Sequence, residues 1–480
     1  MPARAPVLAK TPFAIDPNPL TGAMSAWAGL ASLSRVFRSL KVPAMIEANL
    51  SLKQRARGLS CAQYVECLAL LHARGGESVL DMETLREDTA MEKILGYAPP
   101  SARATAEFLD RFHDGERMEE AQKQAQGKHR QALLIEDSDA LAGLADVLRG
   151  SIRAIARREA LTNQATIDLD ATLIESHKRE AKATYEGYRG YQPLVAVWAE
   201  KALVVADEFR EGNVPANMAL LPCVKRAFGS LPEGIDQLYF RGDSACHDRA
   251  LIDWLADEQR ADGPKGFIGF AISARIEDGL RKVLQQVPDR QWKTFDKDPD
   301  GTLRQWAELD YVPHDRSERK DARPLRYVGL RLQKAQGEFF ADGATAKHFA
   351  ILTNRTENAE SVLRWQRLKA GTVEHVHDEI KNGLGGGRMP SGKFGTNAAW
   401  WRIACLTYNL VEALRSALPD DEYELRTAKL KRLRFCLFAV AGRVVRDRRK
   451  IRLRLGVSRE SIRRLIDLFE TFPLLTQATG

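Results

Sequence analysis

Three acidic residues of this 480-residue chain lie far apart in sequence, but each is in a local setting that suits metal chemistry. Asp170 lies in ATIDLDATLIES and Asp243 ends LYFRGD, so both fall in or at the end of short apolar runs typical of strands. Glu374 lies in GTVEHVHDEIK, a polar segment with helical spacing. Carboxylates held on two strands and a helix suit a pair of hard divalent cations, the equipment for cutting and joining phosphodiesters.

Two neighbouring acids are alternatives to these candidates. Asp168 shares a strand face with Asp170, because strand side chains repeat every two residues. Glu379 follows Glu374 by five residues and lies on the other side of a helix, so only one of the two faces the core. The sequence therefore favours Asp170, Asp243 and Glu374 as catalytic residues and metal ligands, with Asp168 and Glu379 left open.

The segments that carry these acids predict a particular order of elements. Residues 25–160 have apolar residues three and four apart, which indicates helices, the last of them at about 140–159. Three strand-like segments then follow in close succession (QATIDLDATLIES, QPLVAVWAE and KALVVADEF), and next come a helix, the strand QLYFRGD, a helix that Asp248 would cap, and the strand GFIGFAIS. This is the element order of a ribonuclease H-like core. We therefore expect an α/β fold, a ribonuclease H-like mixed sheet flanked by helices.

The rest of the chain predicts additions to this core. Between residues 276 and 358 the helical signal fades, and strand-like segments separated by polar turns indicate a β-rich insertion. Helices return at 359–420, and LRFCLFAVAGRVVRDRRKIRLRLG, followed by a helix at 458–470, predicts a hairpin near the end. The expected parts are a flexible tail (1–24), an all-helical N-terminal domain (25–160), a core in two pieces (161–275 and 359–420), the insertion (276–358) and a C-terminal region (421–480).

Composition narrows the function classes. No apolar run approaches the roughly 20 residues of a membrane span, and the first residues lack the apolar run of a signal peptide, so a cytoplasmic protein without membrane contact is expected. Six scattered cysteines without a CxxC pair argue against a zinc ribbon or a redox motif, and buried free thiols are expected. The net charge is +8, yet the segment 426–464 alone holds 15 basic and 2 acidic residues. Such concentration of positive charge indicates a polyanion partner.

Taken together, the acidic motifs resemble those of a known enzyme family. DLDAT around Asp170, RGDS around Asp243, and Glu374 followed seven residues later by Lys381 resemble the DDE transposases of bacterial insertion sequences, in the group with a ribonuclease H-like core and a β-strand insertion. The resemblance covers about residues 25–470 and is strongest in GTVEHVHDEIKNGLGGGRMPSGKFGTNAAW. The wider family often has Tyr and Arg seven and four residues before the Glu, where this chain has Arg367 and Ala370.

The resemblance implies a cut-and-paste DNA transposase. Such an enzyme would use two Mg²⁺ or Mn²⁺ ions and act on double-stranded DNA, both terminal inverted repeats and target, as a homodimer on the DNA. The N-terminal domain and the basic C-terminal region would recognise the repeats or serve assembly. Two alternatives share these residues: a DNA-binding descendant without catalysis, and a metal-dependent nuclease without strand transfer.

Basic residues near the acids and in the C-terminal region are candidates for DNA contact. Lys381 shares the helix face of Glu374 and would meet a phosphate. GRMPSGKF differs from a phosphate-binding P-loop, because Phe394 replaces the hydroxyl residue and a helix precedes the loop. No nucleotide is therefore expected, and a backbone-level contact with DNA is the preferred interpretation of this loop. His375 and His377 are expected at the surface. The predicted DNA-binding residues are Lys381, Arg388, Lys393, Arg446, Arg448, Arg449, Lys450, Arg452 and Arg454.

Overall fold

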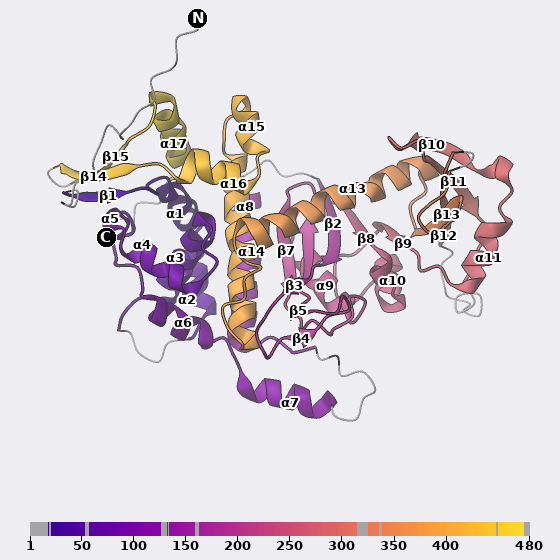
Figure 1. The fold of residues 1–480 in the computed structure, drawn as a ribbon, viewed down its shortest axis with the longest axis horizontal. Helices are drawn as coiled ribbons and strands as arrows, with labels where there is room; N and C mark the ends of the chain where they lie inside the picture. The colour runs from indigo at the N-terminus through magenta and orange to yellow at the C-terminus, as the bar shows by residue number, and fades with distance from the viewer. Residues whose placement is uncertain are drawn as a thin grey trace, which may run out of the picture.

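A nine-stranded mixed sheet forms the centre of the computed structural model, which describes residues 18, 21–52, 57–125, 132, 134–158, 163–313, 325–335, 338–447 and 450–474. The strand order is β10-β11-β12-β13-β9-β8-β2-β6-β7 (Figure 1). These strands are β2 (Gln164–Ala171), β6 (Leu194–Trp198), β7 (Leu203–Glu208), β8 (Gln237–Gly242), β9 (Ile268–Ser273), β10 (Lys293–Lys297), β11 (Leu303–Leu309), β12 (Arg326–Gln333) and β13 (Ala346–Thr353). A small sheet beside them contains β3 (Ile174–Glu175), β4 (Lys182–Ala183) and β5 (Arg189–Tyr191).

The middle of the sheet confirms the predicted ribonuclease H-like order. β2, β6 and β7 form an antiparallel meander, whereas β8 runs parallel to β2 and β9 runs parallel to β8. Parallel neighbours need crossover connections, and these contain α9 (Leu220–Ser230) and α10 (Arg249–Ala256). Asp248 caps α10 as predicted, because its Oδ1 accepts from the amide of Leu251 at 3.0 Å. The fold is therefore α/β, with helices against a mixed sheet.

The insertion strands extend the core sheet. β13 pairs antiparallel with β9, with Thr353 opposite Ala271, and β12, β11 and β10 follow outward to form a lobe at one end of the molecule (Figure 1). The insertion also contains a helix that the sequence did not predict, α11 (Asp278–Gln286). Its buried side is limited to Leu280 and Leu284, so the helical period is weak among polar residues.

Helices make up the N-terminal part, as predicted. They are α1 (Leu30–Ser39), α2 (Val42–Asn49), α3 (Cys61–Arg74), α4 (Met82–Arg86), α5 (Thr89–Leu95), α6 (Ala102–Asp110), α7 (Gly115–Ala125) and α8 (Asp139–Ala156). Of these helices, α1, α3, α6 and α8 contact α14 (Phe394–Ser416), which also contacts β7 of the sheet. Helices and the sheet cover α14, which explains why it is apolar around most of its circumference. One continuous apolar core joins the N-terminal helices to the sheet. The six cysteines are free, and five of them are buried, as expected.

The C-terminal region differs from the sequence prediction in one respect. Only β14 (Gly442–Asp447) and β15 (Lys450–Leu455) form the hairpin, whereas Arg434–Phe438, predicted as part of it, is a π-helical turn after α16 (Leu430–Leu433). The Arg434 side chain holds this turn in place by donating to the carbonyl oxygens of Ala73 and Gly383. The chain continues into α17 (Arg459–Thr471), which Ser458 caps. The remaining short helix, α15 (Tyr423–Arg426), follows α14.

Strand β1 (Ala23–Ser25) pairs with β14 and so lies beside the C-terminal hairpin (Figure 1). Residues 23 and 24, predicted as part of the flexible tail, therefore lie in a strand, and residues 1–17, 19 and 20 lie outside the described residues. Within the described ranges, no helix combines the length and the apolar character needed to cross a membrane.

Candidate active site

The three predicted acids line one cavity of about 450 Å³. Leu169 of β2 lies opposite Gly242 of β8 in the parallel register, so Asp170 and Asp243 occupy equivalent positions at the carboxyl ends of adjacent strands. The third acid, Glu374, comes from α13 (Ala359–Asp378), which crosses over β2 and β8 (Figure 1). The full lining is Asp170, Asp243, Gln366, Arg367, Lys369, Ala370, Val373 and Glu374. Residues separated by more than 200 positions in sequence thus meet at one edge of the sheet.

Each acid has a different local environment. The Asp243 side chain accepts from the amide of Ala245 at 3.0 Å and so caps the short turn that follows β8. The Asp170 side chain is 23% exposed, and its Oδ1 lies 3.5 Å from the ammonium of Lys369. Glu374 is exposed on the cavity side of α13. All three carboxylates are therefore accessible from the cavity.

The two alternative acids are engaged in buried structural contacts. Asp168 is fully buried and accepts from Nε and NH2 of Arg241 at 2.6 and 2.7 Å. Burial raises the pKa of the Asp168 carboxyl, and the Arg241 guanidinium offsets this rise in part. Glu379 is buried as well, and its Oε2 accepts from Arg415 at 3.0 Å and from the amide of Leu430 at 2.7 Å. Neither carboxylate lines the cavity.

Lys369 is a cavity residue that sequence reasoning missed. Motif comparison directed attention to the positions seven and four residues before Glu374, and Lys369 is five before it. The signal lies in the helical period instead: Val362, Gln366, Lys369, Val373 and Val376 are spaced three and four apart, and the valines and Lys369 are buried. A lysine at an inward position of a largely apolar stripe indicates an acidic partner nearby.

Two more side chains follow Glu374 along the helix. His377, expected at the surface, is buried, and burial together with the charges of Lys369 and Lys381 lowers its pKa to about 3. The ring is therefore neutral. Past α13 the chain forms a π-helical turn, Glu379–Gly383, in which the ammonium of Lys381 donates to Thr172 Oγ1 at 3.1 Å and to the Leu173 carbonyl at 2.8 Å. Lys381 thus lies against the chain just beyond Asp170.

The donor set fits hard divalent cations. In the part of the chain that the structure describes, no group of three or more His, Cys, Asp or Glu residues is close enough together to hold a metal ion. The cavity nevertheless offers three accessible carboxylates and neither histidine nor cysteine, and oxygen ligands of this kind are those that Mg²⁺ and Mn²⁺ prefer. Asp170, Asp243 and Glu374 are the residues that would hold such ions.

Comparison with known proteins identifies the family of the chain. The sequence profile of the family described as "Transposase DDE domain group 1" matches residues 20–476. The chain belongs to this family of DDE transposases. It is also similar to a solved structure, the cryo-EM structure of a piggyBac transposase synaptic complex with hairpin DNA, with a TM-score of 0.42 and 12% sequence identity over 94% of this chain and 86% of that one. No curated protein sequence matches the chain.

The glycine-rich loop of the transposase, residues 383–394, is held at its start by contacts within the protein. Carbonyl oxygens at its start are occupied by protein donors: His72 Nδ1 lies 2.8 Å from the Leu384 carbonyl, and Trp400 Nε1 donates to Gly385 at 3.3 Å. Gly385 has φ of +68°, and a Cβ there would come within 2.4 Å of the Gly76 carbonyl oxygen, so the sequence needs glycine for close packing on the N-terminal helices. These contacts lie before Gly387–Phe394, so the predicted backbone-level DNA contact of that segment stays a prediction.

The two basic residues of this loop are at the surface but already have acidic partners. Arg388 lies 3.4 Å from Glu77, and Lys393 lies 2.6 Å from Asp110. Both side chains are at least half exposed, so these pairs contribute little to stability and would exchange readily for phosphates. Their role in DNA contact stays a prediction.

The C-terminal hairpin has one basic and one apolar face. Residues opposite each other in an antiparallel pair share a face, and Arg443 lies opposite Arg454 while Val445 lies opposite Arg452. Arg443, which sequence reasoning missed, thus joins Arg452 and Arg454 on the exposed side. Arg446 lies opposite Ile451, on the face that packs through Val444 against the N-terminal helices. Arg448 and Arg449 lie outside the described residues, and for Lys450 only the strand is described.

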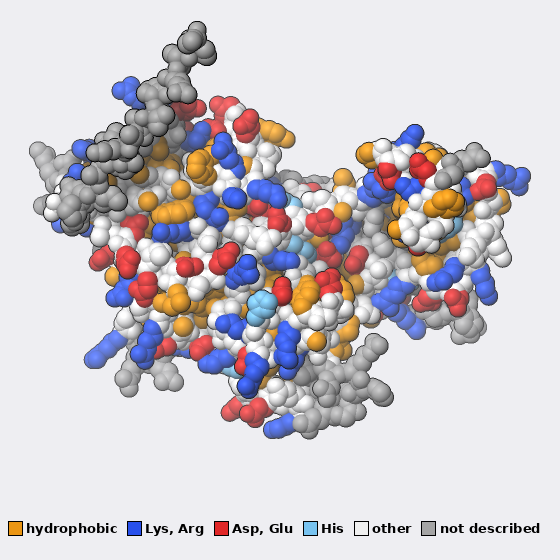
Figure 2. All heavy atoms as spheres, in the orientation of Figure 1, with side chains coloured by type: hydrophobic (Ala, Val, Ile, Leu, Met, Phe, Trp, Pro, Cys, Tyr) orange, Lys and Arg blue, Asp and Glu red, His pale blue; other side chains and the backbone are white. Residues whose placement is uncertain are grey.

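Part of the positive charge of residues 426–464 forms contacts within the described structure. Three of these side chains form ion pairs, namely Arg426–Asp420, Lys429–Asp378 and Arg464–Glu422. Acidic and basic side chains are also interspersed over the face shown in Figure 2. The hairpin face of Arg443, Arg452 and Arg454 is therefore a smaller DNA-binding candidate than the local charge of the sequence suggests.

This face predicts a measurable salt dependence. Replacing Arg452 and Arg454 together by Ala should reduce the log–log slope of DNA affinity against salt by about 1.8, since each phosphate contact contributes about 0.9. Titrations of a fluorescent duplex between low and physiological salt measure the slope. Arg446→Ala, on the opposite face of the same hairpin, is the matched control and should change the slope less. An unchanged slope in the double variant would show that this face is only solvated.

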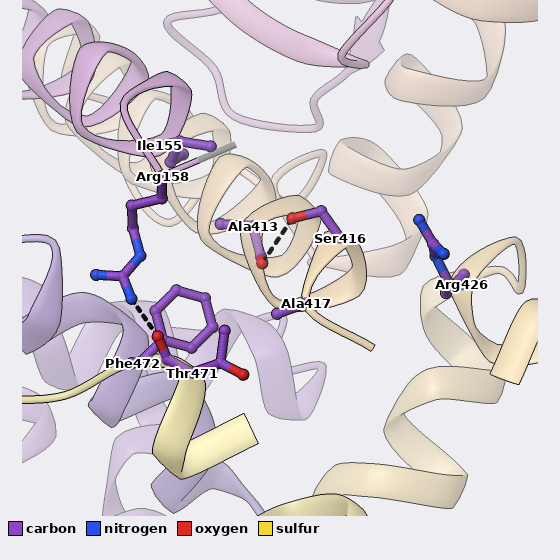
Figure 3. Close-up of a pocket in the computed structure, with 8 residues that line it drawn as sticks. All are labelled: Ile155, Arg158, Ala413, Ser416, Ala417, Arg426, Thr471 and Phe472. Carbon is purple, nitrogen blue, oxygen red and sulfur yellow. Dashed lines mark hydrogen bonds between the residues drawn. The ribbon is translucent and has the colours of Figure 1, made fainter. Parts of the chain in front are cut away.

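A second cavity, of about 540 Å³, shares no lining residue with the first and has no acidic lining residue. Figure 3 shows its lining. It lies between α8, the end of α14 and α17, and is lined by Ile155, Arg158, Ala413, Ser416, Ala417, Arg426, Thr471 and Phe472. The Arg158 guanidinium donates to the Thr471 carbonyl and lies 4.6 Å from the ring centre of Phe472. Its described contacts therefore join the C-terminal helix to α8.

Proposed function

We propose that the chain is a cut-and-paste DNA transposase that cleaves phosphodiesters at the ends of a mobile element and joins them to target DNA. The observation that carries the proposal is the convergence of Asp170, Asp243 and Glu374 on one cavity, at matched ends of two parallel strands and on the helix that crosses them. Membership of the DDE transposase family supports it. The substrate would be double-stranded DNA, and two chains would act on two ends as a homodimer.

The side chains of the cavity would divide the work. Asp170 and Asp243 would hold two Mg²⁺ or Mn²⁺ ions between them, and Glu374 would complete the coordination of one. Such ions, when bound, stabilise the attacking and the leaving oxygen of an in-line displacement. Lys381 lies beside the chain that follows Asp170, where its ammonium would contact a DNA phosphate once released from Thr172 and Leu173. The same site serves water in cleavage and a 3′-hydroxyl in joining, because both are oxygen nucleophiles.

The experiment is a reaction of the full chain with a supercoiled plasmid that carries the element's own ends, in the presence of Mg²⁺ and a target plasmid. We expect breaks at both ends and covalent joining of the freed 3′-ends to the target, resolved by gel electrophoresis and sequencing of junctions. Breaks without joining would identify a nuclease without strand transfer. Binding without breaks would identify a DNA-binding protein without catalysis.

A further inference from the structure

Lys369 is an almost buried cation whose position requires a counter-charge. Its side chain is 10% exposed on the inner face of α13, among residues that pack on the sheet. An ammonium removed from water is costly unless an opposite charge lies close by. Asp170 supplies that charge, with 3.5 Å between Nζ and Oδ1.

The surroundings leave Asp170 as the natural partner of this ammonium. Asp168 is also near enough for the charge of Lys369 to affect it, but both of its oxygens are taken by Arg241. Burial raises the pKa of the neighbouring Cys246 thiol well above its usual value, and His377 is neutral, so neither contributes a negative charge. The Lys369 ammonium therefore lies beside Asp170 at the lining of the cavity, close to where a cation bound to Asp170 would lie.

We propose that Lys369 is a built-in counter-ion, which neutralises Asp170 while no metal is bound and must separate from it when a divalent ion binds. The proposal rests on the proposed function, because it takes Asp170 as a metal ligand. The free energy needed to separate the Lys369–Asp170 pair reduces the binding free energy of the metal ion, so Lys369 weakens the affinity of the site for metal. The flexible four-carbon stem lets the released ammonium turn away from Asp170 within the cavity, toward the DNA phosphate that would lie there.

Removing the charge of Lys369 should therefore tighten metal binding by the protein alone. The full chain without DNA is titrated with Mn²⁺, and free Mn²⁺ is followed by electron paramagnetic resonance. Lys369→Met should bind Mn²⁺ about tenfold more tightly than the wild type or better, because a unit charge about 4 Å away near a protein surface is worth more than a tenfold change in an equilibrium constant. Lys369→Arg, which keeps the charge, should bind no more tightly than the wild type.

Two further variants separate the inference from the function on which it rests. Lys429→Met removes an exposed cation whose ammonium lies 2.8 Å from Asp378, a carboxylate on the helix that carries Lys369. This variant should leave Mn²⁺ affinity unchanged. Asp170→Asn should remove the tight site. If Asp170→Asn removes it but Lys369→Met binds no more tightly than the wild type, the counter-ion inference is overturned and the metal site stands. If Asp170→Asn binds Mn²⁺ as the wild type does, the proposed metal site is itself overturned. Lys369→Gln provides the same comparison if Lys369→Met fails to fold, which thermal melting will show.

Discussion

Asp243→Asn should abolish Mg²⁺-dependent cleavage of element ends, lowering the rate by about 10³-fold or more. The variant keeps the size of the side chain and an oxygen that can still accept from the amide of Ala245, so the turn after β8 should remain. What it loses is the negative charge at the cavity. Charge stabilisation by bound metal is worth several kcal/mol in such reactions, and each 1.36 kcal/mol is about tenfold in rate. Single-turnover cleavage of a labelled end substrate measures the loss.

Glu374→Gln should behave in the same way, and its helix provides the control. Asp378 is four residues further along α13, but its carboxylate is paired with Lys429 and does not line the cavity. Asp378→Asn should therefore keep most of the cleavage rate. Binding of the end substrate by all three variants, measured separately, shows whether the loss is in chemistry. Full cleavage by Asp243→Asn would move the active site elsewhere.

The order of elements and the position of the acids could be predicted because they depend on local signals. Strand and helix periods, read from residue 25 onward, gave the N-terminal helices, the antiparallel meander and the alternating strands and helices of the core. Asp170 lies at the end of a strand and Asp243 directly follows one, and both strands are largely buried. Such placement of Asp is unusual enough to be noticed. Equivalent register on β2 and β8 then follows from the topology.

The contacts that distinguish similar residues could not be predicted, because they depend on distant parts of the chain. Nothing near Asp168 shows that Arg241 donates to both of its oxygens. Nothing near Glu379 shows that Arg415 and the amide of Leu430 both donate to its Oε2. The same holds for the glycine-rich loop, whose packing partners include His72, more than 300 residues earlier. Sequence patterns place such residues on an element, but only the fold assigns their partners.

Counting charges could not show which cations of the C-terminal region are paired, for a related reason. The segment 426–464 is strongly basic in sequence, yet several of its cations pair with acids from other elements, for example Lys429 with Asp378 of α13. Alternation along β15 did predict a basic face, because strand faces follow from a period of two. It could not show that Arg443 joins this face or that Arg446 leaves it, since both depend on the register of the hairpin.

Asp168→Ala should destabilise the protein by about 3–5 kcal/mol, because it leaves the buried Arg241 guanidinium without its counter-charge. Arg241 also donates to the Trp365 carbonyl at 2.7 Å, so the pair joins β2 and β8 to α13 and supports the helix that carries Glu374. Urea unfolding followed by tryptophan fluorescence measures the loss. The same fold offers a matched control on neighbouring strands: Arg326 pairs with Glu308, which is 52% exposed, and Glu308→Ala should cost less than about 1 kcal/mol.

The outcome also decides between the two acids of β2. A replacement of the whole pair by apolar side chains, Asp168→Leu with Arg241→Met, should recover much of the lost stability, because no unpaired charge is then buried. If instead Asp168→Ala costs no more than Glu308→Ala and removes the Mn²⁺ site, then Asp168 is the ligand and Arg241 is its displaceable partner. The buried bidentate geometry argues for the first result: an acid enclosed on both sides by the sheet and α13 has no open side for a metal ion, whereas Asp170, two residues further along the strand, faces the cavity.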